Sequence, residues 1–220
     1  MDEVVLVTGS ESLTGRKLIE KLLSRGCRVV APVAGKETEI SETETPNLTV
    51  LTWNRSSWFS AKTILREIIR RNGKLDAAWI IHQAPTVNVP FSEASPSDAE
   101  LILEQHIKGN VALVREVLPN LPSKGFLGFV RPHKAGTLGS LAAMSDGAFT
   151  SFATGVMNES GTRAWSAGFS NASPDAEGFT TALLSRWDER PKKLEKRWFR
   201  YTEGRRPFSG PSITDFPLRG

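Results

Sequence analysis

Cysteine, tyrosine and histidine are scarce in this chain, and their scarcity limits the sites that it can build. Among 220 residues there are one cysteine, one tyrosine and three histidines. Cys27 has no internal disulfide partner. His82, His106 and His133 lack the spacing of metal ligands, and no cysteine accompanies them. We therefore expect neither a disulfide framework nor a bound metal.

Long apolar runs and a secretory leader are missing as well. No stretch of about 18 apolar residues occurs, so no membrane span is expected. The first residues carry no basic segment followed by an apolar stretch and a cleavage site. The apolar fraction of 39% and the charged fraction of 24% are ordinary for a folded protein. These features predict a cytoplasmic protein in which residues 1–220 form one domain.

The net charge of +4 originates in one segment near the end of the chain. Residues 186–206 hold nine Lys or Arg and four Asp or Glu, whereas the remainder holds nineteen and twenty. Trp198 and Phe199 lie among these cations, a pattern that can bind nucleic acid through phosphate contacts and base stacking. Because acidic residues interrupt the run, we instead predict a solvated helix whose aromatic residues pack on the sheet, and no nucleic-acid partner. The alternative is an anionic ligand or acidic macromolecule bound by this segment.

Apolar segments alternate with amphipathic ones along most of the chain. Val4–Thr8 is continuously apolar, as expected for a parallel strand buried on both faces. The alternation predicts an α/β fold, a Rossmann-like doubly wound parallel sheet with helices on both faces. The expected strands are Val4–Thr8, Arg28–Val33, Leu48–Trp53, Asp76–His82 and Phe126–Val130. The expected helices end near Gly26, at Asn72-Gly73 and at Leu118, the last of them starting at Pro96.

The pattern is less regular after Val130. A stretch rich in Gly, Ala and Ser predicts a helix over Gly147–Met157, and a sixth strand is expected at Arg163–Phe169. A further helix is expected over Asp175–Trp187. We therefore expect a Rossmann-like core over about residues 3–170, followed by a C-terminal helix and an irregular tail over 171–220.

The segment Val4–Gly15 has the layout of a phosphate-binding turn. An apolar strand runs into Thr8-Gly9, a small polar loop follows, and a helix starts at about Gly15. A helix N-terminus presents unpaired N–H groups and a partial positive charge, and glycines let the backbone approach a ligand. The layout predicts a site for the pyrophosphate of a dinucleotide. The alternative is a strand–helix turn that binds nothing.

The loop Thr8-Gly9-Ser10-Glu11-Ser12-Leu13-Thr14-Gly15 resembles the TGxxGxxG loop of extended and atypical members of the short-chain dehydrogenase/reductase family. The family's TGxxxGxG form fits equally well, with Ser12 or Leu13 in place of the middle glycine. The resemblance continues over about residues 3–170. Asn54 lies where the family has an Asp beside the adenine, His82-Gln83-Ala84-Pro85 where it has NNAG, and His106–Gly109 where it has NxxG.

The resemblance fails at the family's catalytic tetrad of Asn, Ser, Tyr and Lys. His106 takes the Asn position. In the stretch that resembles AYxxSK, Phe149 replaces Tyr and Ala153 replaces Lys. Phe149 has no hydroxyl to protonate a carbonyl oxygen, and Ala153 has no cation to lower a tyrosine pKa. Since Tyr201 lies too late in the chain to compensate, the resemblance implies a protein that does not run the family's usual reaction.

The resemblance also implies which residues would hold a dinucleotide. NAD-binding members place an acid about 20 residues past the loop, but the strand here ends without one. Lys36 is positioned to meet a 2′-phosphate and Arg16 adds charge, so NADP is favoured over NAD, with weak or absent binding as an equal alternative. The candidate cofactor residues are Thr8, Gly9, Ser10, Ser12, Leu13, Gly15, Lys36, Asn54 and Ala84.

Three functions stay open at this point. The leading one is a non-catalytic, dinucleotide-sensing or assembly subunit, a homodimer or part of a larger complex, with Phe149, Phe152, Val156 and Met157 as a self-association face. The second is an atypical NADP-dependent oxidoreductase or isomerase that uses His82, His133 or Ser140. The third is a binding protein that uses its basic C-terminal segment.

Overall fold

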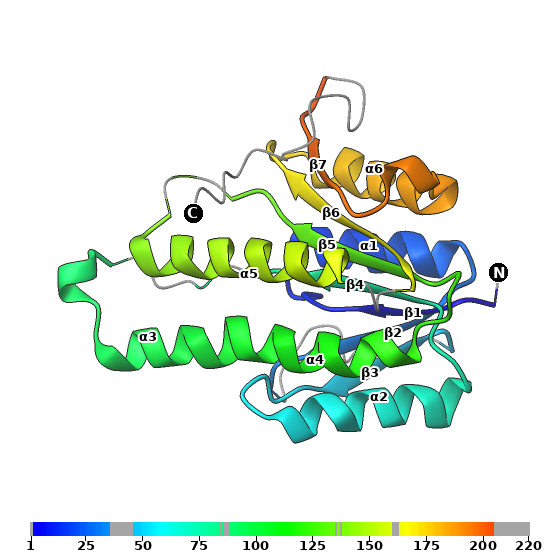
Figure 1. Ribbon diagram of the computed structural model, residues 1–220, viewed down its shortest axis with the longest axis horizontal. Coiled ribbons are helices and arrows are strands. Elements are labelled where there is room, and N and C mark those ends of the chain that lie inside the picture. Colours follow the sequence, from blue (N-terminus) through cyan, green and yellow to red (C-terminus); the bar gives the residue numbers. More distant parts are fainter. Residues whose placement is uncertain are drawn as a thin grey trace.

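The computed structural model arranges seven parallel strands in one sheet, with the order β3-β2-β1-β4-β5-β6-β7 (Figure 1). The strand order reverses direction between β1 and β4, as in a doubly wound fold. The predicted α/β class is therefore confirmed. The structure describes residues 2–35, 46–83, 85, 89–134, 136, 138–159 and 163–204.

The first five strands lie where the apolar runs predict them. The seven strands are β1 (Val4–Val7), β2 (Arg28–Val33), β3 (Leu48–Thr52), β4 (Ala77–Ile81), β5 (Phe126–Arg131), β6 (Trp165–Asn171) and β7 (Trp198–Tyr201). In register, Val5 of β1 lies opposite Val29 of β2 on one side and Ala77 of β4 on the other. Because every pair is parallel, all carboxyl ends meet at one edge of the sheet.

Within the described ranges, six helices and four short helical turns connect these strands. The helices are α1 (Leu13–Ser24), α2 (Trp58–Asn72), α3 (Pro96–Ile102), α4 (Gly109–Val117), α5 (Ser140–Asn158) and α6 (Ala176–Glu189). The turns are η2 (Phe91–Glu93), the π-helical η3 (Leu103–Lys108), η4 (Leu118–Asn120) and η5 (Lys192–Leu194). The predicted long helix over Pro96–Leu118 is thus interrupted by η3. Among the described helices, none combines the length and the apolar character needed to cross a membrane.

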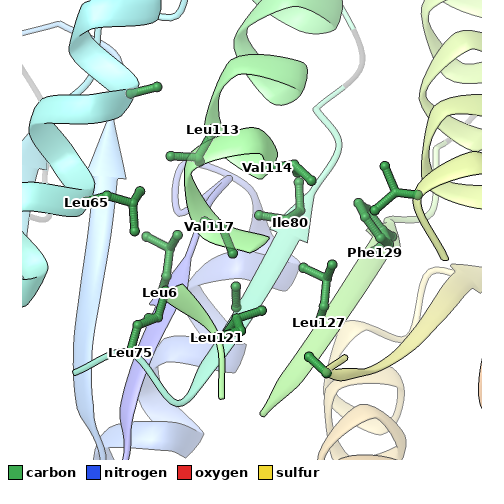
Figure 2. Close-up of a cluster of buried hydrophobic side chains, with 14 of the residues drawn as sticks. Leu6, Leu65, Leu75, Ile80, Leu113, Val114, Val117, Leu121, Leu127 and Phe129 are labelled. Carbon is green, nitrogen blue, oxygen red and sulfur yellow. The ribbon is translucent and has the colours of Figure 1, made fainter. Parts of the chain in front are cut away.

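The helices cover both faces of the sheet. Helices α2, α4 and α5 lie on one face, where Leu6, Ile80 and Leu127 of the strands pack against Leu113 and Val117 (Figure 2). Helices α1 and α6 cover the other face, with Trp79 and Trp187 among the buried residues. Alternate residues of each strand supply the two cores, which explains why the strands are apolar throughout.

Helix α5 begins at Ser140, seven residues before the predicted start at Gly147. The proposed self-association residues of this helix do not form a free face. Phe149, Val156 and Met157 are buried in the core under the sheet, and Phe152 is half-buried against the same core. The prediction named residues on the core-facing side of α5, because an apolar pattern indicates burial but does not tell the protein's own core from a partner.

Beyond α6, which ends at Glu189, the described residues of the basic C-terminal segment do not form the predicted helix. After the short turn η5, residues 198–201 add β7 to the sheet beside β6. Trp198 packs in one core and Phe199 in the other, so their expected contact with the sheet is confirmed. Gly168 of β6 makes room for the Trp198 ring, because a Cβ at that position would meet it. Buried in this way, the aromatic rings are unavailable for stacking on nucleic-acid bases.

A hydrogen bond joins β7 to the start of α6. The Tyr201 hydroxyl donates to Asp175 Oδ2 at 2.6 Å, while Asp175 Oδ1 accepts from the Gly178 N–H at 2.8 Å and caps α6. Burial, followed by the bond to Asp175, raises the pKa of Tyr201 to about 12. The tyrosine is therefore a structural donor rather than a proton source.

We predict that Tyr201→Phe lowers the free energy of unfolding by about 1–2 kcal/mol at pH 7, because a buried bond to a carboxylate is lost. A raised pKa stabilises the fold below the unfolded-state pKa of about 10, and this stabilisation disappears as pH rises through about 12. The difference between wild type and variant should thus shrink between pH 10 and 12 in urea titrations. A double-mutant cycle with Asp175→Asn that shows no coupling at pH 7 contradicts this assignment.

Candidate functional site

The glycine loop is built by three small residues. Gly9 has φ +66°, a backbone conformation that favours glycine. Gly15 packs directly on the Gly9 carbonyl, so a Cβ there has no room. Ser12 caps α1: its Oγ accepts from the Gly15 N–H at 3.0 Å and donates to the Gly9 oxygen at 2.7 Å. The Ser12 side chain thus holds the loop closed.

The other loop residues, Thr8, Ser10 and Leu13, differ in burial and in hydrogen bonding. Thr8 Oγ1 accepts from the Ile81 N–H at 2.8 Å and ties β1 to β4. Ser10 is buried, and its Oγ has no hydrogen-bond partner among the described residues. Leu13, the first residue of α1, is exposed. The backbone geometry of the loop therefore fits a pyrophosphate at the start of α1.

A polar network that sequence reasoning missed crosses the strand ends beside this loop. We call Glu11, Arg55 and Gln83 the Glu11 network. Arg55 Nη2 donates to Glu11 Oε1 at 3.2 Å and to Gln83 Oε1 at 2.6 Å, and Gln83 Nε2 donates to Glu11 Oε2 at 3.0 Å. The Ala34 N–H, just after β2, also donates to Glu11 Oε1, at 3.3 Å. One carboxylate thereby links the ends of β1, β2, β3 and β4.

Arg55 is the buried member of this network. Its side chain is 10% exposed, against 27% for Glu11, and its guanidinium lies 4.9 Å from the centre of the Trp53 ring. Burial lowers the pKa of Arg55, and the charge of Glu11 opposes this shift. The ion pair therefore serves mainly to neutralise a cation that the fold has already taken out of water.

The structure does not test three of the predicted cofactor residues, Lys36, Asn54 and Ala84. Lys36 and Ala84 lie outside the described residues. Asn54 is exposed, and its Oδ1 accepts from the Ser56 N–H at 3.1 Å in the turn that leads into α2. Its side-chain oxygen therefore braces a local turn, and a contact with adenine stays a prediction.

Aromatic side chains pack at the end of β4 next to this network, where His82 directly precedes Gln83. The Phe149 and His82 rings are stacked, with centroids 4.7 Å apart and planes inclined by 17°. Phe149 is 2% exposed, and Ala153, one turn further along α5, is fully buried. Phe149 and Ala153, which the sequence resemblance aligns with the family's Tyr and Lys, are thus part of the core.

A buried charge cluster adjoins this stack. Arg131 donates to both carboxylate oxygens of Asp146, with Nε at 3.1 Å from Oδ1. Lys134 Nζ lies 3.7 Å and His82 Nε2 lies 4.0 Å from the same Oδ1. Ser145 Oγ is 3.5 Å from His82 Nε2. Sequence reasoning identified His82 and Phe149 but not Arg131, Ser145 or Asp146.

The remaining substitute residues are placed differently. His133 is half-buried and Ser140 is exposed at the start of α5; no described contact joins either to His82. His106 lies on η3, where its Nδ1 is 2.8 Å from the Gln83 carbonyl oxygen. Since a carbonyl only accepts, Nδ1 carries the proton, and His106 braces the end of β4. Among the described residues, no group of His, Cys, Asp or Glu is arranged to hold a metal.

The surroundings of His82 and His106 favour the neutral form of each imidazole. Burial, reinforced by the charge of Lys134, lowers the pKa of His82 to about 3, although Asp146 acts in the opposite direction. Burial also lowers the pKa of His106. At neutral pH His82 is therefore an uncharged ring stacked on Phe149, with its Nδ1 lacking a described hydrogen-bond partner.

Comparison with known proteins now decides the family. The sequence profile described as "short chain dehydrogenase" matches residues 3–129. The chain belongs to the short-chain dehydrogenase family. No curated protein is significantly similar to it in sequence.

Solved structures of the family share its fold at low sequence identity. A glucose/ribitol dehydrogenase of this family from Brucella melitensis has a TM-score of 0.78 at 14% identity, covering 92% of this chain and 95% of its own. A short chain dehydrogenase from Burkholderia cenocepacia, in complex with NADP, has a TM-score of 0.77 at 11% identity, with coverages of 90% and 95%. A short-chain dehydrogenase from Streptomyces avermitilis has a TM-score of 0.73 at 15% identity, with coverages of 92% and 88%.

We predict that acidification destabilises this family member through His82. A folded-state pKa of about 3 lies below the unfolded-state value of about 6.5, so the stabilisation present above pH 6.5 is lost as pH falls toward 3. The slope reaches about 1.4 kcal/mol per pH unit in urea titrations. His82→Asn should flatten the profile between pH 7 and 4.5, whereas His133→Asn, outside the stack, should keep it. An unchanged slope in His82→Asn contradicts the neutral, buried imidazole.

Proposed function

We propose that this protein binds a dinucleotide, NADP in preference to NAD, without using it for the family's reduction. It then acts as a nucleotide-sensing or assembly subunit. One contrast carries the proposal: the glycine loop has the tight strand–loop–helix turn of a phosphate site, whereas Phe149 and Ala153 are core residues. The adenosine half of the ligand then has a place to bind, and the reactive half meets no tyrosine hydroxyl at Phe149.

The preference for NADP rests on charge near the end of β2. The strand end itself, Val33-Ala34-Gly35, carries no acid to hold ribose hydroxyls. Arg16 lies on the first turn of α1, where its Nη1 donates to the Glu11 carbonyl oxygen at 2.9 Å. Lys36 remains a predicted contact for the 2′-phosphate.

NADPH, when bound, would supply a hydride, and a carbonyl substrate would then need a proton at its oxygen. Phe149 has no proton to give. His82 is neutral and buried, and Asp146 is held by Arg131. These residues exclude solvent and fill space, which supports a ligand-binding role over turnover.

We predict that calorimetry detects NADP binding and that NADPH oxidation with carbonyl substrates stays at background. Gly15→Ala should weaken NADP binding at least tenfold, because the added Cβ meets the Gly9 carbonyl. Gly147→Ala is the matched control, since a Cβ there meets nothing within 4 Å. Circular dichroism checks that both variants fold. Equal binding by wild type and Gly15→Ala contradicts a site at the loop.

The cluster around Asp146 favours a second candidate function, an atypical NADP-dependent oxidoreductase or isomerase. Burial lowers the pKa of Lys134, and its Nζ lies 3.7 Å from Asp146 Oδ1. This amine and His82 are the groups best placed to move a proton. Turnover that is lost in Lys134→Met but kept in Ser140→Ala supports this alternative and overturns the non-catalytic proposal.

The assembly role rests on the outer face of α5. Of its 19 residues only Asp146 is charged, and Asp146 is buried. The outward-facing positions are therefore uncharged, with Met144, Gly147 and Ser151 exposed along one stripe. An uncharged helix face of this length favours contact with a second helix, and a homodimer is the simplest partner.

We predict that Met144→Arg converts a dimer to a monomer in light scattering after size exclusion, because a desolvated charge at the contact is unfavourable. Thr63→Arg, at an exposed position of α2, should leave the mass unchanged. A wild type that is monomeric at high micromolar concentration contradicts self-association through α5.

A further inference from the structure

The partners of the Glu11 carboxylate belong to three different parts of the sheet edge. The Ala34 N–H follows β2, Arg55 follows β3 and Gln83 follows β4. Glu11 itself belongs to the loop after β1. The carboxylate thus accepts hydrogen bonds from a guanidinium, a side-chain amide and a backbone N–H. Donors of these kinds also bind anionic ligands.

Arg55 is packed more tightly and is less exposed than the Glu11 carboxylate that it binds. Arg55 is pressed against α4: a Cβ on Gly109 would meet Arg55 Cβ at 2.9 Å. Arg55 Nε is buried and has no hydrogen-bond partner among the described residues. The guanidinium thus has donor capacity that Glu11 does not use. Glu11 is the more exposed member and lies on a loop.

From this asymmetry we infer that Arg55, Gln83 and the Ala34 N–H form a subsite for a phosphate on the adenosine ribose, and that Glu11 is its internal stand-in. This inference rests on the proposed dinucleotide binding. A phosphate carries more charge and more acceptor oxygens than a carboxylate, so it satisfies the buried Arg55 at least as well. Ligand entry then exchanges one anion for another, and Arg55 is never left unpaired.

The competing interpretation is that Glu11 stays in place and accepts the ribose hydroxyls, as an acid does in NAD-binding relatives of this architecture. The contacts disfavour it. Glu11 Oε1 already accepts from Arg55 and the Ala34 N–H, and Oε2 accepts from Gln83. Only Oε2 keeps an acceptor position, so a diol that bound the carboxylate through both hydroxyls would have to displace a charged or amide donor with a weaker neutral one.

Glu11→Gln and Glu11→Ala test the subsite by binding alone. Calorimetry would use adenosine 2′,5′-bisphosphate, 5′-ADP, NAD and inorganic phosphate. We expect both variants to bind the 2′,5′-bisphosphate about tenfold more tightly than wild type, because an internal competitor is removed. The gain for 5′-ADP should be smaller, and Arg55→Met in the Glu11→Gln background should abolish the gain. Glu20→Gln, which removes an exposed carboxylate paired with Lys17 on α1, is the control.

The outcomes separate the subsite from the proposed function. If wild type and Glu11 variants bind the 2′,5′-bisphosphate equally, the subsite is overturned and dinucleotide binding stands. If the variants lose affinity for NAD, Glu11 is a ribose ligand and the stand-in idea is overturned. If well-folded wild type and variants bind neither the nucleotides nor NADP, both proposals fail. Thermal melting checks that the variants fold. Without ligand, Glu11→Ala should have a lower Tm than wild type, and adenosine 2′,5′-bisphosphate should restore the Tm to the wild-type value.

Discussion

The parallel pairing of all seven strands is the constraint on which the rest of the structure depends. It buries both faces of the sheet and brings every carboxyl end to one edge. The polar groups that follow β1 to β5 must find partners at that edge, either in one another or in a ligand. In this protein they find many of them in one another, through the Glu11 network and the Asp146 cluster, which meet at His82-Gln83 after β4.

The two groups of residues at this edge differ in how firmly they are held. Phe149 and Ala153 belong to the core, so moving them aside would break packing. At the loop, Glu11 is held by polar contacts alone, and an incoming anion can replace each of them. Under the proposed function, the edge therefore offers an exchangeable site for the adenosine half of the ligand. Phe149 packs in the core at the position where the sequence resemblance expects the proton donor.

Local sequence signals predicted the elements that depend on local pattern. Continuous apolar runs located β1 to β5, and Gly9, Gly15 and the cap at Ser12 behave as a strand–loop–helix turn requires. The strand β7 was mistaken for a helix because its cations and aromatics have no period, and only pairing with β6 decides its conformation. Neither polar cluster was predictable, since Glu11 meets Arg55 and Gln83 across 44 and 72 residues of chain. A lone Glu in a glycine loop carries no signal for such partners.

The most direct test is a crystal structure of the complex with NADP. The account predicts adenosine density along Gly9–Gly15, a phosphate against Arg55 with Glu11 turned away, and His82 still stacked on Phe149. Density for an ordered nicotinamide beside Lys134, with Phe149 displaced from His82, would contradict it and point to a working reductase.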